Sequence, residues 1–289
     1  MLRELGHVAF LAQPGPAPRC DLLLALHAMR SAEAVRTARS PVIVALTGTD
    51  LYRDIKVDAG AKHSLEVADR LIVLHAGAAA ELPRRLRAKV RVIPQSAKRP
   101  ERIPPPAGHR FEVAVVGHLR DVKDPLRTAL AARLLPSSSR VAVVHAGRAL
   151  TREMGAAAQG EMRRNPRYRW LGELPRWKAR ALIARARVLC ITSELEGGAN
   201  VVSEAIVAGT PVLASRIPAM RAILGADYPG LFSYGDTAGL ARLLRRVEEE
   251  ARFLAGLRRR CVALQPSLSP QREKAALAAL VAEFLLPVR

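Results

Sequence analysis

The segment Cys190–Ser215, CITSELEGGANVVSEAIVAGTPVLAS, places carboxylates and glycines between two apolar runs. RVLCITS is typical of a strand, LEGGAN of a loop, and VVSEAIVAG of a helix that Gly209 and Pro211 end. Glycines let backbone amides approach an anion closely, and a helix N-terminus adds its positive dipole. Carboxylates in the same place accept hydrogen bonds from sugar or ribose hydroxyls. Glu196 and, eight residues later, Glu204 therefore indicate a nucleotide-sugar site, unless they are a solvated loop acid and a helix-surface acid.

The elements that must position this site alternate along the whole chain. Short apolar runs alternate with segments of helical period, including helices predicted over 125–134, 176–187 and 237–261. This alternation is typical of an α/β fold, with parallel sheets covered on both faces. The predicted strands are HVAFLA, DLLLALH, PVIVALT, RLIVLH, VRVIPQ, FEVAVVG, RVAVVHAG, YRWLGEL, RVLCITS, PVLAS and GLFSYG.

One proline-rich segment interrupts the alternation. Pro94–Arg110 holds five prolines and almost no apolar residues, so it predicts a linker over 96–110. The sequence therefore predicts a first domain over 1–95 and a second over 111–269. A last helix over 270–289 can pack back on the first domain. Two doubly wound, Rossmann-like domains facing a cleft are the natural architecture, with ligands at the carboxyl ends of the strands.

The charge of the chain is strongly basic, with 46 Lys and Arg against 26 Asp and Glu and a net charge of +20. Such an excess raises the remote alternative of a nucleic-acid-binding protein. Only 4% of the residues are aromatic, which leaves little to stack bases on. The basic residues are spread along the chain, and runs such as RWKARALIARAR have the spacing of solvated helix faces. We therefore expect no nucleic-acid partner, although the excess favours phosphorylated ligands.

Localisation signals are also absent from the sequence pattern. No apolar run approaches the ~20 residues that a membrane helix needs, and the start does not have the pattern of a signal peptide. The cysteines, Cys20, Cys190 and Cys261, are widely spaced and form no CxxC pair, which indicates reduced thiols and neither a disulfide nor a metal site. We expect a cytoplasmic protein without a membrane partner.

The pair of acids around GGAN resembles the donor-site motif of the retaining-type GT-B glycosyltransferases of family 4. The resemblance implies that Glu196 faces the donor sugar and contributes to catalysis, and that Glu204 binds the ribose. It also implies that the loop amides face the sugar and phosphate. These loop residues are Gly197, Gly198, Ala199 and Asn200.

A second motif, VAVVGHLRDVKDPLRTAL, is similar to the GRL…K loop of the same family, whose arginine and lysine contact the diphosphate. Gly117 and Lys123 match that pattern. His118 occupies the arginine position, and Arg120, two residues later, is the substitute cation unless it is a surface residue. The resemblance thus implies that Lys123 and Arg120 stabilise the departing diphosphate.

The resemblance narrows to the selenosugar synthases of selenoneine biosynthesis. ALTGTDLYRDI, VVGHLRDVKDP, SELEGGANVVSEA and GADYPGLFSYGD are among the segments that carry it. It implies transfer of the sugar of UDP-GlcNAc or UDP-glucose to selenophosphate, with no cofactor and no metal. Members usually begin with a strand and a glycine-rich loop before LRELGH, so we expect that strand and loop to be absent here.

The first domain is expected to hold the acceptor. TGTDLYRDI follows the predicted strand PVIVAL directly, which places Thr49 and Asp50 at a strand end and Arg53 near a helix N-terminus. His27 ends another strand and is equally well explained as a packing residue. The alternative is an oxygen acceptor, such as a lipid or another sugar. A lipid acceptor predicts an aromatic-bearing amphipathic helix, whereas LHAMRSAEAVRTARS has no aromatic residue.

Overall fold

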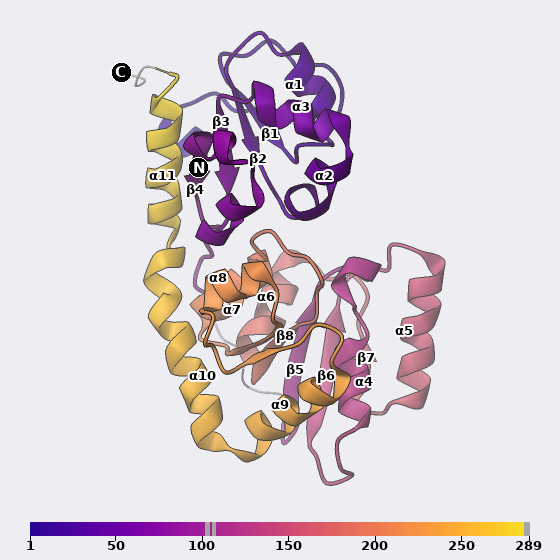
Figure 1. The fold of residues 1–289 in the computed structure, drawn as a ribbon. Helices are drawn as coiled ribbons and strands as arrows, with labels where there is room; N and C mark the ends of the chain where they lie inside the picture. Colours follow the sequence, from indigo (N-terminus) through magenta and orange to yellow (C-terminus); the bar gives the residue numbers. More distant parts are fainter. Residues whose placement is uncertain (102–104, 106–107, 286–289) are drawn as a thin grey trace. The chain divides into compact units, whose positions relative to one another are not determined.

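The chain divides into two compact units, each built on a parallel sheet (Figure 1). The computed structural model describes residues 1–101, 105 and 108–285. Part of the predicted linker and the last four residues of the predicted C-terminal helix region lie outside them. The first unit comprises Met1–Ser96, Leu195–Gly198 and Ser267–Arg289, and the second comprises Ala97–Glu194 and Ala199–Pro266.

The sheet of the first unit has four parallel strands in the order β1-β2-β3-β4. Apart from Arg70 at the start of β3, its central strands consist of apolar, mostly β-branched residues with buried side chains, as expected for strands covered on both faces. The bounds are β1 Leu23–Leu26, β2 Val42–Ala45, β3 Arg70–Val73 and β4 Val90–Val92.

Alternate side chains of β2 pack against helices on opposite faces of this sheet. Val42 and Val44 belong to a core that includes residues of α1 (Ala32–Thr37) and α3 (Ala59–Val67). Ile43 and Ala45 pack instead with Leu280 of α11, the helix Pro270–Ala282. The short helical pieces of the unit are η1 Arg3–Leu5, the π-helical turn η2 Asp50–Asp54, α2 Ile55–Val57, η3 Ala76–Glu81 and η4 Arg84–Lys89.

Glu283, directly after α11, ties this helix to the sheet. Its carboxylate lies 2.6 Å from Arg70 Nε on β3 and receives two hydrogen bonds from Arg91 on β4, at 3.0 and 3.1 Å. The hydrogen bond from Arg91 is the largest of the effects that lower the pKa of Glu283. A helix from one end of the sequence is thereby joined to strands from the other end.

The second unit has six parallel strands in the order β10-β9-β8-β5-β6-β7. The order in which the chain adds strands to the sheet reverses between the parallel neighbours β5 and β8. Ligands of such sheets bind at the carboxyl ends of the strands beside this point. The strands are β5 Phe111–Val116, β6 Val141–Ala146, β7 Tyr168–Trp170, β8 Val188–Ile191, β9 Val212–Ser215 and β10 Leu231–Phe232.

Right-handed connections place α4 and α5 on one face of this sheet and α6, α7 and α8 on the other. α9 packs on α4, and α10 contacts α7 and α8. The helices are α4 Arg127–Arg133, α5 Arg152–Arg164, α6 Arg176–Arg185, α7 Asn200–Ala208, α8 Pro218–Leu224, α9 Thr237–Glu249 and α10 Ala251–Leu264, with η5 Asp121–Lys123 and η6 Gln265–Leu268.

One predicted strand is wrong. HVAFLA forms no strand, and the side chains of Val8 and Leu11 are more than nine-tenths exposed. An apolar run becomes a strand only when a neighbour accepts its backbone hydrogen bonds, and β1 pairs only with β2 within the described residues. The other ten predicted strands are present.

One predicted helix is divided. The segment 237–261 forms α9 and α10, separated at Glu250, whose φ and ψ of −102° and 89° are not helical. Leu244 and Val247 are the last buried residues of α9, and α10 buries Leu257 and Cys261. Ten residues separate Val247 from Leu257, so a continuous helix would rotate the second buried face by about 80° from the first. The break allows both faces to be buried.

Candidate active site

The loop after β5, Gly117–Asp124, is called the β5 loop below. It runs beside the end of β6, because Gly117 N–H donates to Ala146 O and Leu119 N–H donates to Arg148 O, both at 2.9 Å. His118 is exposed, and its Nδ1 accepts the N–H of Arg148 at 3.1 Å. The predicted residues Gly117 and His118 are thus held by backbone contacts at the carboxyl end of the sheet.

The basic part of the β5 loop is held by the end of β8. Thr192 donates its hydroxyl to the carbonyls of Lys123 and Asp124, at 2.9 and 2.8 Å. The N–H of Glu194 donates to Val122 O at 2.9 Å. Lys123 and Arg120 are half-buried in this loop, so two predicted cations lie where β5 and β8 end side by side.

Glu204 lies on α7 and faces two arginines of α6. Its Oε1 is 3.6 Å from Arg176 and 3.8 Å from Arg180, and its side chain is 11% exposed. Burial raises the pKa of Glu204, and the two arginines oppose that effect. The sequence assigned these arginines to a solvated helix face. Their spacing of four residues on one helix was the available signal.

The start of α7 has an unusual backbone. Ala199 precedes the helix in the left-handed region, with φ 43° and ψ 76°, and its carbonyl accepts the N–H of Val202 at 2.7 Å. Asn200 is the first helical residue and is exposed. The predicted residues Ala199, Asn200 and Glu204 therefore all belong to the first turns of α7.

Glu196, Gly197 and Gly198 are buried and belong to the first unit. A Cβ atom at position 197 would lie 2.1 Å from Thr47 O, and one at position 198 would lie 2.7 Å from Leu74 Cδ1. Position 197 therefore requires glycine for close packing against the backbone of Thr47, and a side chain at position 198 would have to displace that of Leu74. The sequence pattern explains these glycines differently, by the close approach of backbone amides to an anion.

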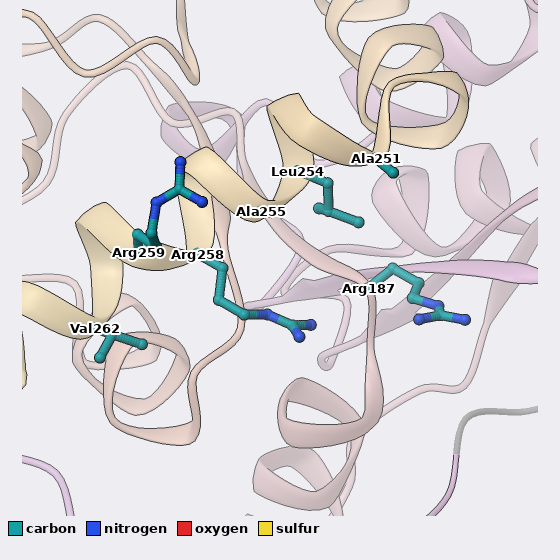
Figure 2. A pocket seen from close by; sticks show the side chains of 7 residues that line it. All are labelled: Arg187, Ala251, Leu254, Ala255, Arg258, Arg259 and Val262. Atoms are coloured by element: carbon teal, nitrogen blue, oxygen red, sulfur yellow. The ribbon is translucent and has the colours of Figure 1, made fainter.

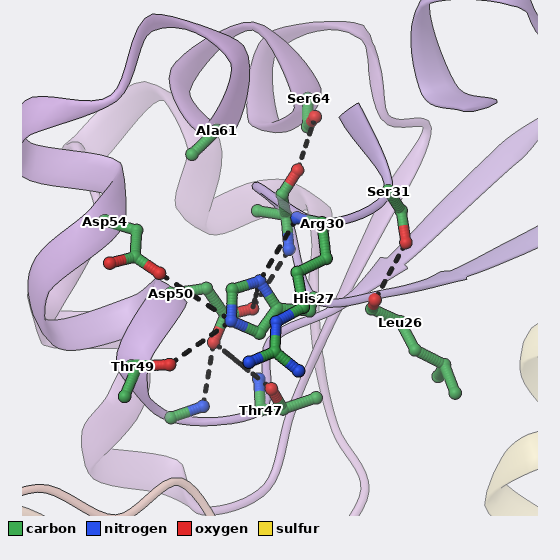
Figure 3. A network of polar contacts seen from close by, with 12 residues as sticks. Leu26, His27, Arg30, Ser31, Thr47, Thr49, Asp50, Asp54, Ala61 and Ser64 are labelled. Carbon is green, nitrogen blue, oxygen red and sulfur yellow. Dashed lines mark hydrogen bonds and ion pairs between the residues drawn. The ribbon is translucent and has the colours of Figure 1, made fainter. Parts of the chain in front are cut away.

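Three of the four acceptor-side residues predicted in the first unit, His27, Thr49 and Asp50, lie in one network of polar contacts (Figure 3). Asp50 is fully buried, and its carboxylate accepts the N–H groups of Ala28, Thr47 and Gly48 at 2.8 to 3.0 Å. This carboxylate therefore joins the ends of β1 and β2, which leaves it little capacity to bind a ligand.

Both ring nitrogens of His27 face polar groups of the same network. Its Nδ1 faces the N–H of Arg30 at 3.4 Å, and its Nε2 lies 3.2 Å from Thr49 Oγ1 and 3.6 Å from the Asp54 carboxylate. Arg53 differs, because its side chain is 62% exposed and forms an ion pair with Asp54 at 3.1 Å. Arg53 is thus the predicted acceptor-side cation that solvent reaches.

A buried pair that the sequence did not reveal lies beneath the β5 loop. His145 Nε2 lies 3.1 Å from Gly117 O, and its Nδ1 lies 3.0 Å from the hydroxyl of Tyr168. Burial lowers the pKa of His145 to about 4, against a smaller opposing effect of its hydrogen bond to Gly117. The only signal in the sequence was a histidine at the end of an apolar strand.

A cavity of about 490 Å³ in the second unit lies apart from these residues (Figure 2). It is lined by Arg187, Ala251, Leu254, Ala255, Arg258, Arg259 and Val262. Arg187 precedes β8, so the cavity is at the amino end of that strand, and the β5 loop is at the carboxyl end of the sheet.

Two further properties concern the described residues alone. No three or more His, Cys, Asp and Glu side chains are grouped so that they could hold a metal ion. None of the described helices combines the length and the apolar composition that crossing a membrane requires.

Comparison with known proteins connects this geometry to enzymes. Residues 99–263 match the family described as "Glycosyl transferases group 1". No curated protein matches the chain in sequence.

Solved structures match almost the whole chain. HepE of Anabaena, solved with UDP and glucose, has a TM-score of 0.75 at 16% identity, over 91% of this chain and 78% of that one. A sucrose-phosphate synthase from Thermosynechococcus elongatus has a TM-score of 0.70 at 17% identity, over 91% and 72%. A UDP-forming trehalose-phosphate synthase from Burkholderia xenovorans has a TM-score of 0.72 at 13% identity, over 92% and 74%. At these identities the likeness concerns the fold, and it confirms the fold class predicted from the sequence.

Proposed function

The chain belongs to the group 1 glycosyl transferases, and from that premise we propose that it transfers the sugar of a UDP-sugar to selenophosphate. Its fold is GT-B, an α/β fold with two parallel sheets. Family membership makes the chain a glycosyltransferase. The donor nucleotide and the acceptor are the parts that we propose here.

The proposed donor is UDP-GlcNAc or UDP-glucose. HepE, which shares the fold, is solved with UDP and with UDP-glucose. In this chain, Lys123 and Arg120 of the β5 loop are proposed to bind the diphosphate, and the start of α7 adds its helix dipole. Glu204 is proposed to accept a ribose hydroxyl through the oxygen that does not face Arg176 and Arg180.

The proposed reaction breaks the bond between the anomeric carbon and the diphosphate oxygen, and the electron pair leaves with UDP. A selenium lone pair of selenophosphate forms the carbon–selenium bond through an oxocarbenium-like transition state. Lys123 and Arg120 stabilise the negative charge that develops on the leaving diphosphate, with the amides near Asn200. Selenophosphate is already anionic, so the nucleophile needs no strong general base. Glu196 is proposed to face the sugar.

The proposed acceptor site uses the exposed guanidinium of Arg53 in the first unit. A small dianion needs charge-assisted hydrogen bonds more than an apolar surface. Thr49 is a neighbouring hydroxyl, whereas Asp50 and His27 are proposed to shape the loop that carries both residues. The resemblance to the selenosugar synthases supports selenophosphate over a hydroxyl acceptor.

The observation that carries the donor proposal is the arrangement of Lys123 and Arg120 at the carboxyl ends of β5 and β8 in a chain of this family. Incubation with selenophosphate and a panel of nucleotide sugars, analysed by mass spectrometry, tests the reaction. The expected product, formed only from UDP-sugars, is a sugar joined through selenium to phosphate, or the free selenosugar once water has hydrolysed its selenium–phosphorus bond. A glycosylated hydroxyl acceptor without selenosugar would assign the chain to an oxygen acceptor instead.

Nucleotide binding is tested separately through Glu204. Glu204→Gln is expected to weaken UDP binding by about 1–3 kcal/mol, because a charged hydrogen bond to ribose is lost. Calorimetry compares UDP with GDP and ADP. Glu173→Gln is the matched control, because Glu173 is an exposed acid of the same unit, 4.0 Å from Arg148. Equal UDP affinity of Glu204→Gln and the wild type would remove Glu204 from the ribose site.

A further inference from the structure

His118 stands where the family resemblance expects an arginine, and its contacts define its protonation. Nδ1 accepts the backbone N–H of Arg148 at 3.1 Å. A ring nitrogen that accepts a hydrogen bond carries no proton, so the proton of the neutral ring is on Nε2. Nε2 has no hydrogen-bond partner in the part of the chain that the structure describes, and the side chain is exposed. His118 therefore presents one N–H donor to solvent beside Arg120.

Gly117, the residue before His118, is held in place by a second histidine, His145. The carbonyl of Gly117 can only accept, so His145 Nε2, 3.1 Å away, must carry a proton. Because the ring is buried and neutral, its Nδ1 accepts the hydroxyl hydrogen of Tyr168 at 3.0 Å. The chain Tyr168–His145–Gly117 thus has one direction of donation.

Steric contact adds to these hydrogen bonds. A Cβ atom at position 147 would lie 1.8 Å from Gly117 O and 3.0 Å from His118 N. The backbone directly after β6 therefore contacts the β5 loop at this point. Gly117 is held on three sides, through its N–H to Ala146, its carbonyl to His145 and its contact with Gly147.

We infer that His118 donates a neutral, directional hydrogen bond from Nε2 to a phosphate oxygen of the donor, and that His145 is the positioning residue that holds the β5 loop for this contact. The inference rests on the proposed function, because it assigns the diphosphate of the donor as the acceptor of that bond. Lys123 and Arg120 supply charge, and His118 supplies a donor of fixed direction that needs no proton uptake.

The phosphate contact is tested with UDP and uridine, which differ only in the diphosphate. NMR chemical shifts follow both titrations, because they also measure weak binding. His118→Ala is expected to weaken UDP about 5- to 10-fold and to leave uridine unchanged. His118→Asn, which keeps an acceptor for Arg148 N–H but has no distal donor, is expected to behave like His118→Ala. His118→Gln, with an amide N–H at the distance of Nε2, is expected to recover most of the UDP affinity.

The positioning role is tested in His145. His145→Leu is expected to weaken UDP and not uridine, and His145→Gln is expected to recover affinity because it still donates to Gly117 O. Val143→Ala is the matched control, because Val143 is buried on the same strand and its apolar side chain can form no hydrogen bond to the β5 loop. If the loss of UDP affinity came from reduced stability alone, Val143→Ala would show it as well.

¹⁵N NMR of the histidine rings tests the geometry without any ligand. Both His118 and His145 are expected as Nε2–H tautomers, and His145→Leu is expected to mix the tautomers of His118. A proton on Nδ1 of His118, or unchanged UDP affinity in His118→Ala when the wild type binds UDP, overturns the inference. A wild type that does not bind UDP instead overturns the proposed function and the phosphate contact with it, while the NMR result still decides the tautomers.

Discussion

His27 in the first unit and His118 in the second occupy similar places at the ends of parallel strands. In both rings Nδ1 faces a backbone N–H, of Arg30 and Arg148 respectively. The Nε2 of His27 is then bound to Thr49 inside a buried network, whereas the Nε2 of His118 is exposed. The same side chain at the same kind of position belongs to an internal hydrogen-bond network in one unit and is accessible to a ligand in the other.

The difference shows what a strand-end position does and does not indicate. Parallel strands bring polar residues together at their carboxyl ends in both sheets. In the first unit Asp50 uses its carboxylate to collect three backbone N–H groups. In the second unit His145 performs the internal role and leaves His118 accessible. The donor and acceptor capacity that remains unused, more than the position, identifies a binding residue.

The comparison requires a structural role for Asp50. We therefore expect Asp50→Ala to have the largest effect on stability. It leaves the N–H groups of Ala28, Thr47 and Gly48 without their acceptor, and we expect the first unit to lose about 3–5 kcal/mol of stability. Trp170 and Trp177 are both in the second unit. Urea unfolding followed by circular dichroism should therefore show an early transition that tryptophan fluorescence does not show.

Asp58→Ala is the control for this prediction. Asp58 caps α3 of the same unit by accepting the N–H of Ala61 at 2.7 Å. Loss of one cap costs about 1 kcal/mol. If Asp50→Ala were no more destabilising than Asp58→Ala, the carboxylate of Asp50 would not be the element that joins β1 and β2.

The internal role of His145 predicts a dependence on pH. Its pKa is about 4 in the folded protein and near 6.5 when unfolded, so between these values the unfolded chain binds a proton that the folded chain does not. The second unit should be fully stable above pH ~6.5 and lose about 3 kcal/mol as the pH falls towards 4. Unfolding followed by tryptophan fluorescence measures this loss. His145→Gln should show a shallower dependence, and an identical dependence would contradict the assignment.

Gly147→Ala sharpens the comparison at the β5 loop. The new Cβ would lie 1.8 Å from Gly117 O, so the backbone of the loop must move away from β6. We expect UDP affinity to fall at least tenfold, about 1.4 kcal/mol. Gly160→Ala on α5 is the control, because its Cβ would meet only the flexible ends of arginines at 3.7 Å or more. It should preserve UDP affinity and slightly raise helix stability.

Arg53→Ala should have the smallest effect on stability. Its guanidinium is mostly exposed, and its ion pair with Asp54 is of the kind that contributes less than about 1 kcal/mol. We expect the free energy of unfolding to change by no more than about 0.5 kcal/mol. A raised KM for selenophosphate in this variant would then report binding alone. Clear destabilisation would instead give Arg53 a structural role, like that of His27.

Much of the fold could be predicted from the sequence. Buried parallel strands are nearly continuous apolar runs, and ten of them could be recognised in this way. HVAFLA has the same local pattern but pairs with no strand among the described residues, and partners are not visible in a local pattern. The break at Glu250 arises because α9 and α10 bury different faces, which depends on their neighbours.

The site could be predicted only where several residues with functional side chains lie close together in the sequence. The β5 loop and the segment around Glu204 are of this kind. The pair His145–Tyr168 joins two strands 23 residues apart, and Arg176 and Arg180 look like an ordinary basic helix face. Burial and tertiary neighbours determine the role of these residues, and neither is encoded in their spacing.

The attachment of α11 to the first sheet has a consequence for synthesis. Leu280 and Glu283 complete the face formed by β2, β3 and β4, yet the ribosome makes the whole second unit before these residues. The apolar face of Ile43 and Ile72 therefore stays uncovered while the second unit emerges and folds, since domains generally fold as units in order of synthesis. The second unit can therefore fold during translation, whereas the first unit is completed only after α11 has been synthesised. In that interval the uncovered apolar face of the first unit is accessible to a chaperone.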